Sequence, residues 1–227
     1  MVTAKSRAYH GRRKRERTRE RLLDAAIGLF ARQAVEATRI EDLVRTADIS
    51  RGTFYNYFRT IDQVQVACLA RIFTLVAAEA APAAGAVHRP AMRIAVEILG
   101  FLMVLRRHRT WARAYVHLRP SSLPLTRYRQ VQVFRARLRQ GVSDGVFRVA
   151  STESAFDMVA GTLMVAVRSM LGGRPQADHA RAVTVTVLQG LGVGYVRAQT
   201  ICREAARLVS RHRVRTPRRL AGARRAR

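Results

Sequence analysis

A nine-residue segment, Ser50–Phe58, combines side chains that bind nucleic acids with a spacing that decides which of them are exposed. Phe54, Tyr57 and Phe58 recur at i, i+3 and i+4, the spacing of one apolar helix face, so we expect them to pack inward. The remaining side has a polar character and carries Arg51, Gly52, Thr53, Tyr55 and Asn56. Guanidinium, amide and hydroxyl groups hydrogen-bond phosphates and base edges. The segment therefore has the chemistry of a helix that contacts DNA.

A second short helix is predicted directly before this segment. Its apolar positions fall at i, i+3, i+4 and i+7, which is one helical face: Ile40, Leu43, Val44 and Ala47. Thr38 and Glu41 have the T-x-x-E spacing of a capping box, so we expect the helix to begin there. Asp48-Ile49 is a tight break, and Ser50 is the next N-cap candidate. Two short helices across such a turn form a helix-turn-helix unit.

The string from Thr38 to Phe58, with Leu43, Ala47 and the run Asp-Ile-Ser-Arg-Gly-Thr-Phe-Tyr-Asn-Tyr-Phe, resembles the helix-turn-helix of the tetracycline-repressor-like (TetR) family of bacterial transcriptional regulators. The resemblance extends over about residues 17–71. The sequence departs from the family pattern at Ala34, Arg39, Asp48 and Ile61. The change at Ile61 removes a lysine that would contact phosphate, while Arg39 and Arg59 can supply other contacts.

The resemblance implies a division of labour among the exposed residues. Hydroxyls and tyrosines mainly fix the phosphates, while Arg51, Thr53 and Asn56 are better placed for base edges. Gly52 at the helix start lets the backbone approach a phosphate, where the helix dipole also helps. The residues predicted to bind DNA are Thr38, Arg39, Ser50, Arg51, Gly52, Thr53, Tyr55, Asn56, Tyr57 and Thr60.

The predicted fold class is all-α, with a three-helix helix-turn-helix head followed by a larger helical domain for ligand binding and dimerisation. We expect a flexible basic arm over residues 1–15, the head over 16–62, the larger domain over 63–211, and a disordered basic tail over 212–227. Thr60 and Gln63 form a further capping box that opens a helix to about Glu79. Residues 80–90, with Pro82, Gly85 and Pro90, are predicted to form a hinge.

Charge is the strongest compositional feature, with a formal net charge of +27 over 227 residues. Residues 1–21 and 203–227 are both markedly basic. Such a surface attracts polyanions and predicts salt-dependent DNA binding. Terminal charge runs are also typical of solvated, disordered tails, and the excess of Arg over Lys is consistent with codon bias. Charge therefore supports nucleic-acid binding but does not establish it.

Location and redox state follow from simpler features. No uncharged run of 18 or more apolar residues is present, so no membrane span is expected, and the charged N-terminus is unlike a signal peptide. A cytoplasmic protein is predicted. Cys68 and Cys202 are only two and far apart in sequence, which favours reduced buried thiols over a disulfide framework, with a redox-sensing pair as the alternative.

The helices of the larger domain are rich in apolar residues on more than one face, which calls for a partner surface. The segments 153–171 and 179–209 are expected to form a four-helix interface in a homodimer, and the resemblance implies the same arrangement; a monomer core is the alternative. The resemblance also implies an effector pocket in this domain. Its candidate walls are Phe101, Met103, Trp111, Tyr115, Phe134, Met158 and Met164, although such residues are also common in ordinary cores.

Other chemistries have weaker support. Alternating β-branched residues followed by Gly190, Gly192 and Gly194 imitate a strand that opens a dinucleotide-binding turn, but the glycine spacing differs and no acidic residue follows at the required distance. A kink or break at these glycines is the favoured interpretation. The six histidines show no metal spacing, and no catalytic set is visible. No cofactor, metal or enzymatic activity is expected.

These observations favour a dimeric regulator, most often a repressor in this family, that binds a palindromic DNA operator and responds to a small-molecule effector. The alternative from another class is a nonspecific architectural protein that coats DNA through its arginine-rich tails. The two differ in whether sequence specificity survives removal of the tails.

Overall fold

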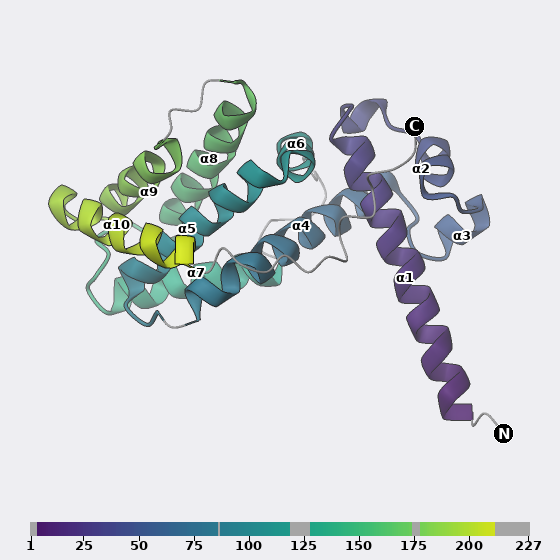
Figure 1. Ribbon diagram of the computed structural model, residues 1–227, viewed down its shortest axis with the longest axis horizontal. Coiled ribbons are helices and arrows are strands. Elements are labelled where there is room, and N and C mark those ends of the chain that lie inside the picture. Colours follow the sequence, from purple (N-terminus) through teal and green to yellow (C-terminus); the bar gives the residue numbers. More distant parts are fainter. Residues whose placement is uncertain (1–3, 86, 119–127, 174–177, 212–227) are drawn as a thin grey trace. The chain divides into compact units, whose positions relative to one another are not determined.

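The computed structural model describes residues 4–85, 87–118, 128–173 and 178–211, which are helical almost throughout and contain no strand (Figure 1). The all-α prediction is confirmed. The described helices are α1 (Ala4–Phe30), the short 3-10 helix η1 (Val35–Ala37), α2 (Ile40–Ala47), α3 (Arg51–Tyr55), α4 (Ile61–Ala84), α5 (Pro90–Arg107), α6 (Arg109–His117), α7 (Arg129–Ser143), α8 (Thr152–Leu171), α9 (His179–Gly190) and α10 (Tyr195–Arg211).

The chain divides into two compact units by packing. The first unit comprises residues 1–75, 105–135 and 164–176, and the second comprises 76–104, 136–163 and 177–227. Several helices contribute to both units, so the packing division is not a simple cut of the chain. It does not test the functional boundary expected after residue 62, which stays a prediction. The predicted tail at 212–227 lies outside the described residues.

The core of the head comes from three short stretches of the first unit. The buried face of α1 carries residues at i, i+4 and i+8 (Leu22, Ala26 and Phe30), and Phe30 and Leu22 are fully enclosed. Leu43 from α2 and Phe54 from α3 are also fully buried. Burial of each such side chain contributes about 1.5–3 kcal/mol to folding. The three helices predicted to form this core are therefore present and pack through the predicted face.

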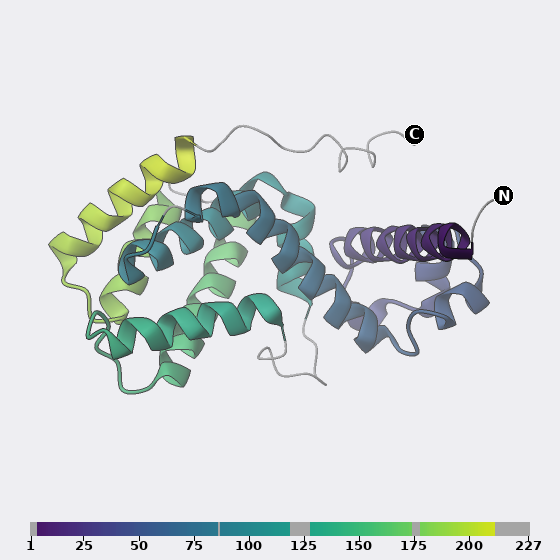
Figure 2. The ribbon, with the colours of Figure 1, turned by 90° about the horizontal axis from the view of Figure 1, so that it is seen from below.

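The flexible arm expected over residues 1–15 is wrong from Ala4 onward, because α1 is one continuous helix that begins there (Figures 1 and 2). Arg, Lys, Glu and Ala are strong helix formers, and a run of charged side chains does not by itself prevent helix formation. Arg13 also lies over the ring of Tyr9, one turn away, at 5.6 Å from the ring centroid. The basic stretch is thus part of a helix that continues into the core.

The starts of α2 and α4 test the two predicted capping boxes. The Thr38–Glu41 box is wrong: Arg39 is the N-cap, and its backbone N–H donates to Asp42 Oδ2 at 3.1 Å. The cap at Thr60 is confirmed, because Gln63 N–H donates to Thr60 Oγ1 at 3.2 Å. A helix begins where a side chain satisfies its free N–H groups, and a carboxylate at the third position can serve the start as well as a hydroxyl.

Helix α4 runs to Ala84 with Pro82 inside its last turn, so the hinge expected over residues 80–90 is shorter than predicted. Two helical stretches of the described chain, 61–83 and 152–171, are long and apolar enough to cross a membrane by length and composition. The expectation of no such segment was based on uncharged runs, which Arg71 and Arg168 interrupt. Core helices of globular proteins pass the same test, and α4 supplies the buried residues Val64, Cys68 and Ile72. The two segments are therefore weak evidence for a membrane.

The segment 183–194 in the second unit is helical up to Gly190, so the strand required by a dinucleotide site is absent there and the predicted break is confirmed. Gly192 has φ +86°, which L side chains rarely adopt, and an added Cβ would lie 2.9 Å from Arg148 Cβ. Arg148 N–H also donates to Leu191 O at 3.0 Å. The glycine therefore ends α9 and allows α10 to start in a new direction (Figure 2).

Candidate nucleic-acid interface

The turn between α2 and α3 is closed by a residue in the left-handed conformation. Asp48 has φ 52° and ψ 58°, and the N–H of the next residue, Ile49, donates to Val44 O at 3.2 Å. Asp is one of the few L-residues that adopt this region readily, so it replaces the expected glycine. Arg21 Nη2 of α1 donates to Ala47 O at 3.1 Å and to Asp48 O at 3.2 Å. The turn is therefore fixed both by its own backbone hydrogen bond and by the Arg21 side chain of α1.

The first turn of α3 is fixed by Ser50, which confirms the predicted N-cap. Ser50 Oγ accepts a hydrogen bond from Thr53 N–H at 3.1 Å and lies 2.8 Å from Thr53 Oγ1. Such a cap contributes about 1 kcal/mol. Helix α3 spans only Arg51–Tyr55, with Asn56 as its C-cap, and is shorter than the nine residues expected. The polar side chains thus sit on a short, capped helix and the turn that follows it.

The two faces of α3 differ as predicted. Phe54 is fully buried and Phe58 is 5% exposed, while Arg51, Gly52 and Asn56 are exposed and Tyr55 is 44% exposed. The ring of Phe54 meets those of Tyr55 and Phe58 at 5.5 and 6.3 Å between centroids. The buried aromatic side therefore anchors the helix and leaves its polar edge accessible.

Tyr57 belongs to neither face alone. It is half-buried, and its hydroxyl donates to Arg15 O of α1 at 3.1 Å. Arg19 of α1 lies over the ring of Phe58 at 5.5 Å from the centroid. These contacts attach the recognition segment to the basic half of α1. Tyr57 was predicted both as a core residue and as a DNA ligand, and in the described structure its hydroxyl binds the protein.

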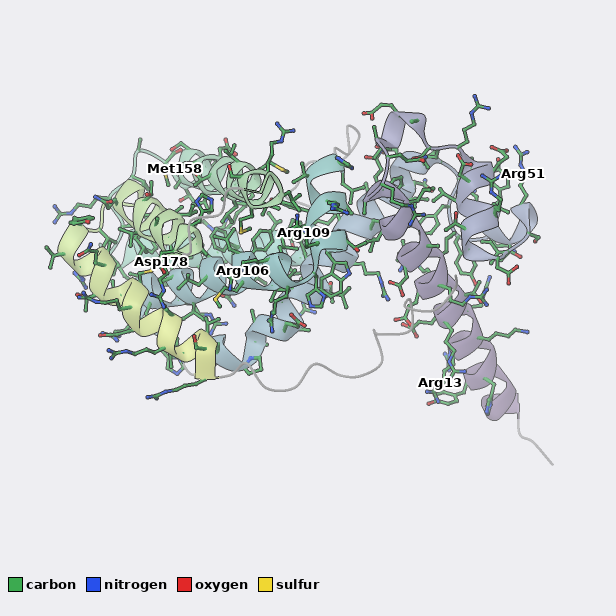
Figure 3. The ribbon with its side chains drawn as sticks, turned by 45° about the horizontal axis from the view of Figure 1, so that its top comes forward. Arg13, Arg51, Arg106, Arg109, Met158 and Asp178 are labelled. Atoms are coloured by element: carbon green, nitrogen blue, oxygen red, sulfur yellow. The ribbon has the colours of Figure 1, made fainter. Side chains whose placement is uncertain are left out.

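Arg51 occupies the outer edge of this site, as Figure 3 shows. Its Nη1 lies 3.1 Å from Glu41 Oε1, and its guanidinium carbon lies 5.9 Å from the centroid of Tyr55. The hydrogen bond with Tyr55 and the charges of Tyr55 and Glu41 raise the pKa of Arg51. Glu41 and Tyr55 thus hold the guanidinium in place. Both contacts are exposed to solvent, so a polar ligand could replace them.

The other predicted contacts are spread around the head. Arg39 and Thr60 are exposed, the first at the start of α2 and the second at the start of α4. Thr38 is 3% exposed, and its hydroxyl donates to Ala34 O at 3.1 Å and accepts from Gln33 Nε2 at 3.1 Å. The structure thus places Thr38 inside the head, where it fixes the segment before α2.

Sequence reasoning missed that α1 itself adds an ordered basic surface. Residues 12–21 hold seven Lys or Arg residues and two Glu residues on exposed helix positions, among them Arg13, labelled in Figure 3. Arg71 of α4 lies 3.6 Å from Glu20 and 2.8 Å from Asp24. Burial lowers the pKa of Arg71, while its hydrogen bond to Asp24 and the charges of Asp24 and Glu20 raise it, with a net rise. Two acidic groups of α1 are therefore neutralised from within the protein.

The candidate walls of an effector pocket are divided between the units. Trp111, Tyr115, Phe134 and Met164 belong to the first unit, and Phe101, Met103 and Met158 belong to the second. Tyr115 alone among the seven is buried, at 7% exposed, and its ring meets Phe73 at 6.2 Å. Trp111 stacks on His108 at 4.0 Å. Whether the seven residues line one pocket stays a prediction.

The second unit contains an open cleft of about 510 Å³ that sequence reasoning did not anticipate. None of the seven candidate residues lines it. Its walls contain three arginines, one histidine, one glutamate and three apolar side chains: Arg89, Arg207, Arg211, His88, Glu204, Val87, Met92 and Leu208.

Metal and thiol chemistry have little support in the residues that the structure describes. No group of three His, Cys, Asp or Glu side chains there is placed to hold a metal ion. Cys68 and Cys202 are both buried free thiols, and burial raises the pKa of each. A thiol that stays protonated is a poor nucleophile, so the structure gives no sign of a reactive cysteine.

Helices α2 and α3, with a tight turn between them, a capped second helix, a buried aromatic anchor and an exposed polar edge, form a helix-turn-helix unit. Residues 22–68 match the model of the bacterial regulatory proteins of the tetR family, which covers most of the head and the start of α4. The head is therefore similar to the DNA-binding domain of this family. Comparison with curated proteins gives no match.

Solved structures of regulators share the fold over most of their length. RolR in complex with resorcinol is 26% identical, with a TM-score of 0.65 over 84% of this chain and 95% of that one. TylP, a TetR regulator from Streptomyces fradiae, is 18% identical, with a TM-score of 0.63 over 88% and 99%. FadR from Bacillus subtilis in complex with stearoyl-CoA is 17% identical, with a TM-score of 0.60 over 77% and 99%.

Proposed function

We propose that this chain is a sequence-specific DNA-binding transcriptional regulator, a repressor that a small-molecule effector releases from a palindromic operator. The observation that carries the proposal is the polar edge of α3, where Arg51, Tyr55 and Asn56 are exposed beside a fully buried Phe54. Arg pairs in a bidentate manner with guanine and Asn with adenine in the major groove. The protein acts in the cytoplasm, associates with the nucleoid when bound to DNA, and has no enzymatic role.

The regulator works as a homodimer. Tyr195 and Val196 at the start of α10 are 55% and 74% exposed, an unusual position for two adjacent large side chains. A second copy that covers these residues would relate two reading heads by a dyad, and the distance between the heads would set the spacing of the two half-sites. The effector is assigned by analogy, because RolR and FadR are both solved with a bound small molecule.

The effector would act by preference between two separations of the heads. If the effector binds more tightly to the conformation whose heads are spaced wrongly for the operator, it shifts the population toward that conformation, and the protein leaves the DNA. This step needs no covalent chemistry and no cofactor.

The test begins with selection of bound fragments from random-sequence DNA and continues with affinity measurements on the selected site. Arg51→Ala and Asn56→Ala should each lower specific affinity while nonspecific affinity changes little, whereas Tyr55→Phe, which removes a phosphate contact, should lower both. Arg139→Ala, an exposed arginine on α7, is the matched control. Unchanged discrimination between the selected site and random DNA in the Arg51→Ala and Asn56→Ala variants would contradict the proposal and favour a nonspecific architectural role.

A further inference from the structure

Three buried polar atoms in the first unit have no hydrogen-bond partner among the described residues: Asp62 Oδ1, Gln65 Oε1 and Tyr128 Oη. Gln65 is 8% exposed and Tyr128 is 5% exposed. Folded proteins leave few such atoms, because a buried polar group that loses its bonds to water destabilises the fold unless something replaces them. Bound water or the polar groups of a small ligand would supply the missing hydrogen bonds.

Two of the three residues, Asp62 and Gln65, lie on one stripe of helix α4, and Tyr128 packs beside Phe73 of the same stripe. Asp62, Gln65, Leu69 and Phe73 recur at i, i+3, i+7 and i+11, which places them on the same helix face. Tyr128 meets Phe73 edge to face, with 5.8 Å between the ring centroids, and the charge of Asp62 reaches its hydroxyl. The ring of Tyr128 therefore lies beside Phe73, and its hydroxyl is near enough for the charge of Asp62 to act on it.

The surroundings of this stripe are aromatic and well fixed. Phe73 also meets the buried Tyr115 edge to face at 6.2 Å. The start of α7 is held on α4 by Gln130, whose Nε2 donates to Thr74 Oγ1 at 2.7 Å. Polar atoms thus occupy one end of the stripe and aromatic edges the other, which is the combination that binds a ring carrying polar substituents.

Charge decides what class of ring fits. Burial raises the pKa of both Tyr115 and Tyr128 to about 12, so both are neutral near pH 7. Asp62 and Gln65 present oxygen acceptors, and a carboxylate ligand would bring further acceptors to them. The nearest cation on α4, Arg71, lies on the opposite face of the helix and is engaged by Asp24 and Glu20. The stripe therefore favours a neutral hydrogen-bond donor over an anion.

We propose that Asp62, Gln65 and Tyr128, named here the α4 polar cluster, bind the hydroxyl groups of a small, neutral, hydroxyl-bearing aromatic molecule. This rests on the proposed function and names the class of its effector. Helix α4 begins at the Thr60 cap directly after the recognition segment, so an occupant of its first turns contacts the helix that leaves the DNA-binding head.

The test is calorimetric titration of the full-length protein with phenol, catechol, resorcinol and hydroquinone, and with benzoate as the anionic ligand of the same size. At least one neutral probe should bind with Kd below about 1 mM, and benzoate should bind at least about tenfold more weakly. Gln65→Leu and Tyr128→Phe should each weaken the neutral probe by about tenfold, since each removes one hydrogen bond. Gln132→Leu on the exposed side of α7 is the control and should change nothing.

Thermal unfolding of the ligand-free variants separates a ligand site from an internal hydrogen bond. An unpaired buried amide is unfavourable, so Gln65→Leu should leave the midpoint unchanged or raise it. A lowered midpoint with unchanged probe affinity would show that Gln65 has a partner within the protein, and would overturn the proposal. Absence of binding by all four neutral probes, or equal binding of benzoate, would overturn it as well.

DNA affinity of the ligand-free protein distinguishes this failure from failure of the proposed function. A protein that binds its selected site but none of the probes retains the regulator assignment and loses this effector class. A protein that binds a neutral probe but discriminates no DNA sequence retains the site and loses the regulator assignment.

Discussion

The recognition segment and the α4 polar cluster handle polar groups in opposite ways. In the head, Ser50, Thr53 and Arg51 are exposed or half-buried and already bonded to side chains or backbone of the helix-turn-helix unit. In the cluster, Gln65 and Tyr128 are buried and their oxygens have no partner among the described residues. Exposed groups with weak local bonds can exchange them for a large ligand that arrives from solvent, whereas buried unpaired groups require an occupant that fits. The comparison assigns DNA to the first region and a small molecule to the second.

The largest expected effect separates anchoring from recognition within the head. Phe54→Ala should lower the free energy of unfolding by about 3–5 kcal/mol, because it removes a fully buried aromatic ring. Tyr55→Ala, one residue away and 44% exposed, should lower it by only about 1 kcal/mol. Denaturant unfolding monitored by circular dichroism measures both. Similar losses in the two variants would mean that α3 does not have one buried and one exposed face.

Burial of the Tyr115 hydroxyl should make the free energy of unfolding fall at alkaline pH. The folded state raises the pKa of Tyr115 from 10 to about 12, so the protonated phenol is favoured in the folded protein. This contribution is fully present below pH 10 and is lost as the pH rises through 12, by an amount of about 3 kcal/mol. Tyr115→Phe should remove that part of the alkaline loss in unfolding experiments. An identical pH profile in the variant would show that the hydroxyl is accessible to water.

Base recognition by the head predicts a smaller and more selective effect. Arg51→Ala or Asn56→Ala should cost about 1–3 kcal/mol in binding to the selected site, the value of one bidentate base contact. Affinity for random DNA should change much less in the same fluorescence-anisotropy assay. If both affinities fall together, the two side chains contact phosphate and carry no sequence information.

The smallest effect concerns the local bond that prepares α3 for binding. Ser50→Ala should destabilise the head by about 1 kcal/mol through loss of the cap to Thr53 N–H. Hydrogen exchange should then become faster at the first amides of α3 and remain unchanged in α6. Uniformly faster exchange would indicate global destabilisation and would contradict a local role for the cap.

The head was predictable because its signals are local. The spacing of Phe54 and Phe58, the hydroxyl of Ser50 and the cap at Thr60 act over three or four residues, and each has the predicted place in the structure. The start of α2 was missed because the carboxylate of Asp42, and not the nearby Thr38 hydroxyl, satisfies the first free N–H. The helical state of residues 4–15 was missed because a charge run was taken as a sign of disorder.

The α4 polar cluster was not predictable from the sequence. Gln65 and Tyr128 are more than sixty positions apart in the chain, and the sequence contains no local pattern that joins them. Their relation depends on how the start of α7 packs on α4 through Phe73 and Thr74. The pocket prediction included Tyr115 as an aromatic of helical spacing, but the residues that give the site its polarity came only from the tertiary structure.

The central claim, that the exposed edge of α3 reads DNA sequence as one of a pair of heads, is tested most directly by guanine-methylation interference on the selected site. Two blocks of interference in the major groove are expected, related by a dyad and set by the spacing of the two heads, with loss of a guanine contact in both blocks with Arg51→Ala. Interference at a single block, or the same pattern with Arg51→Ala and Asn56→Ala as with the unchanged protein, would contradict it.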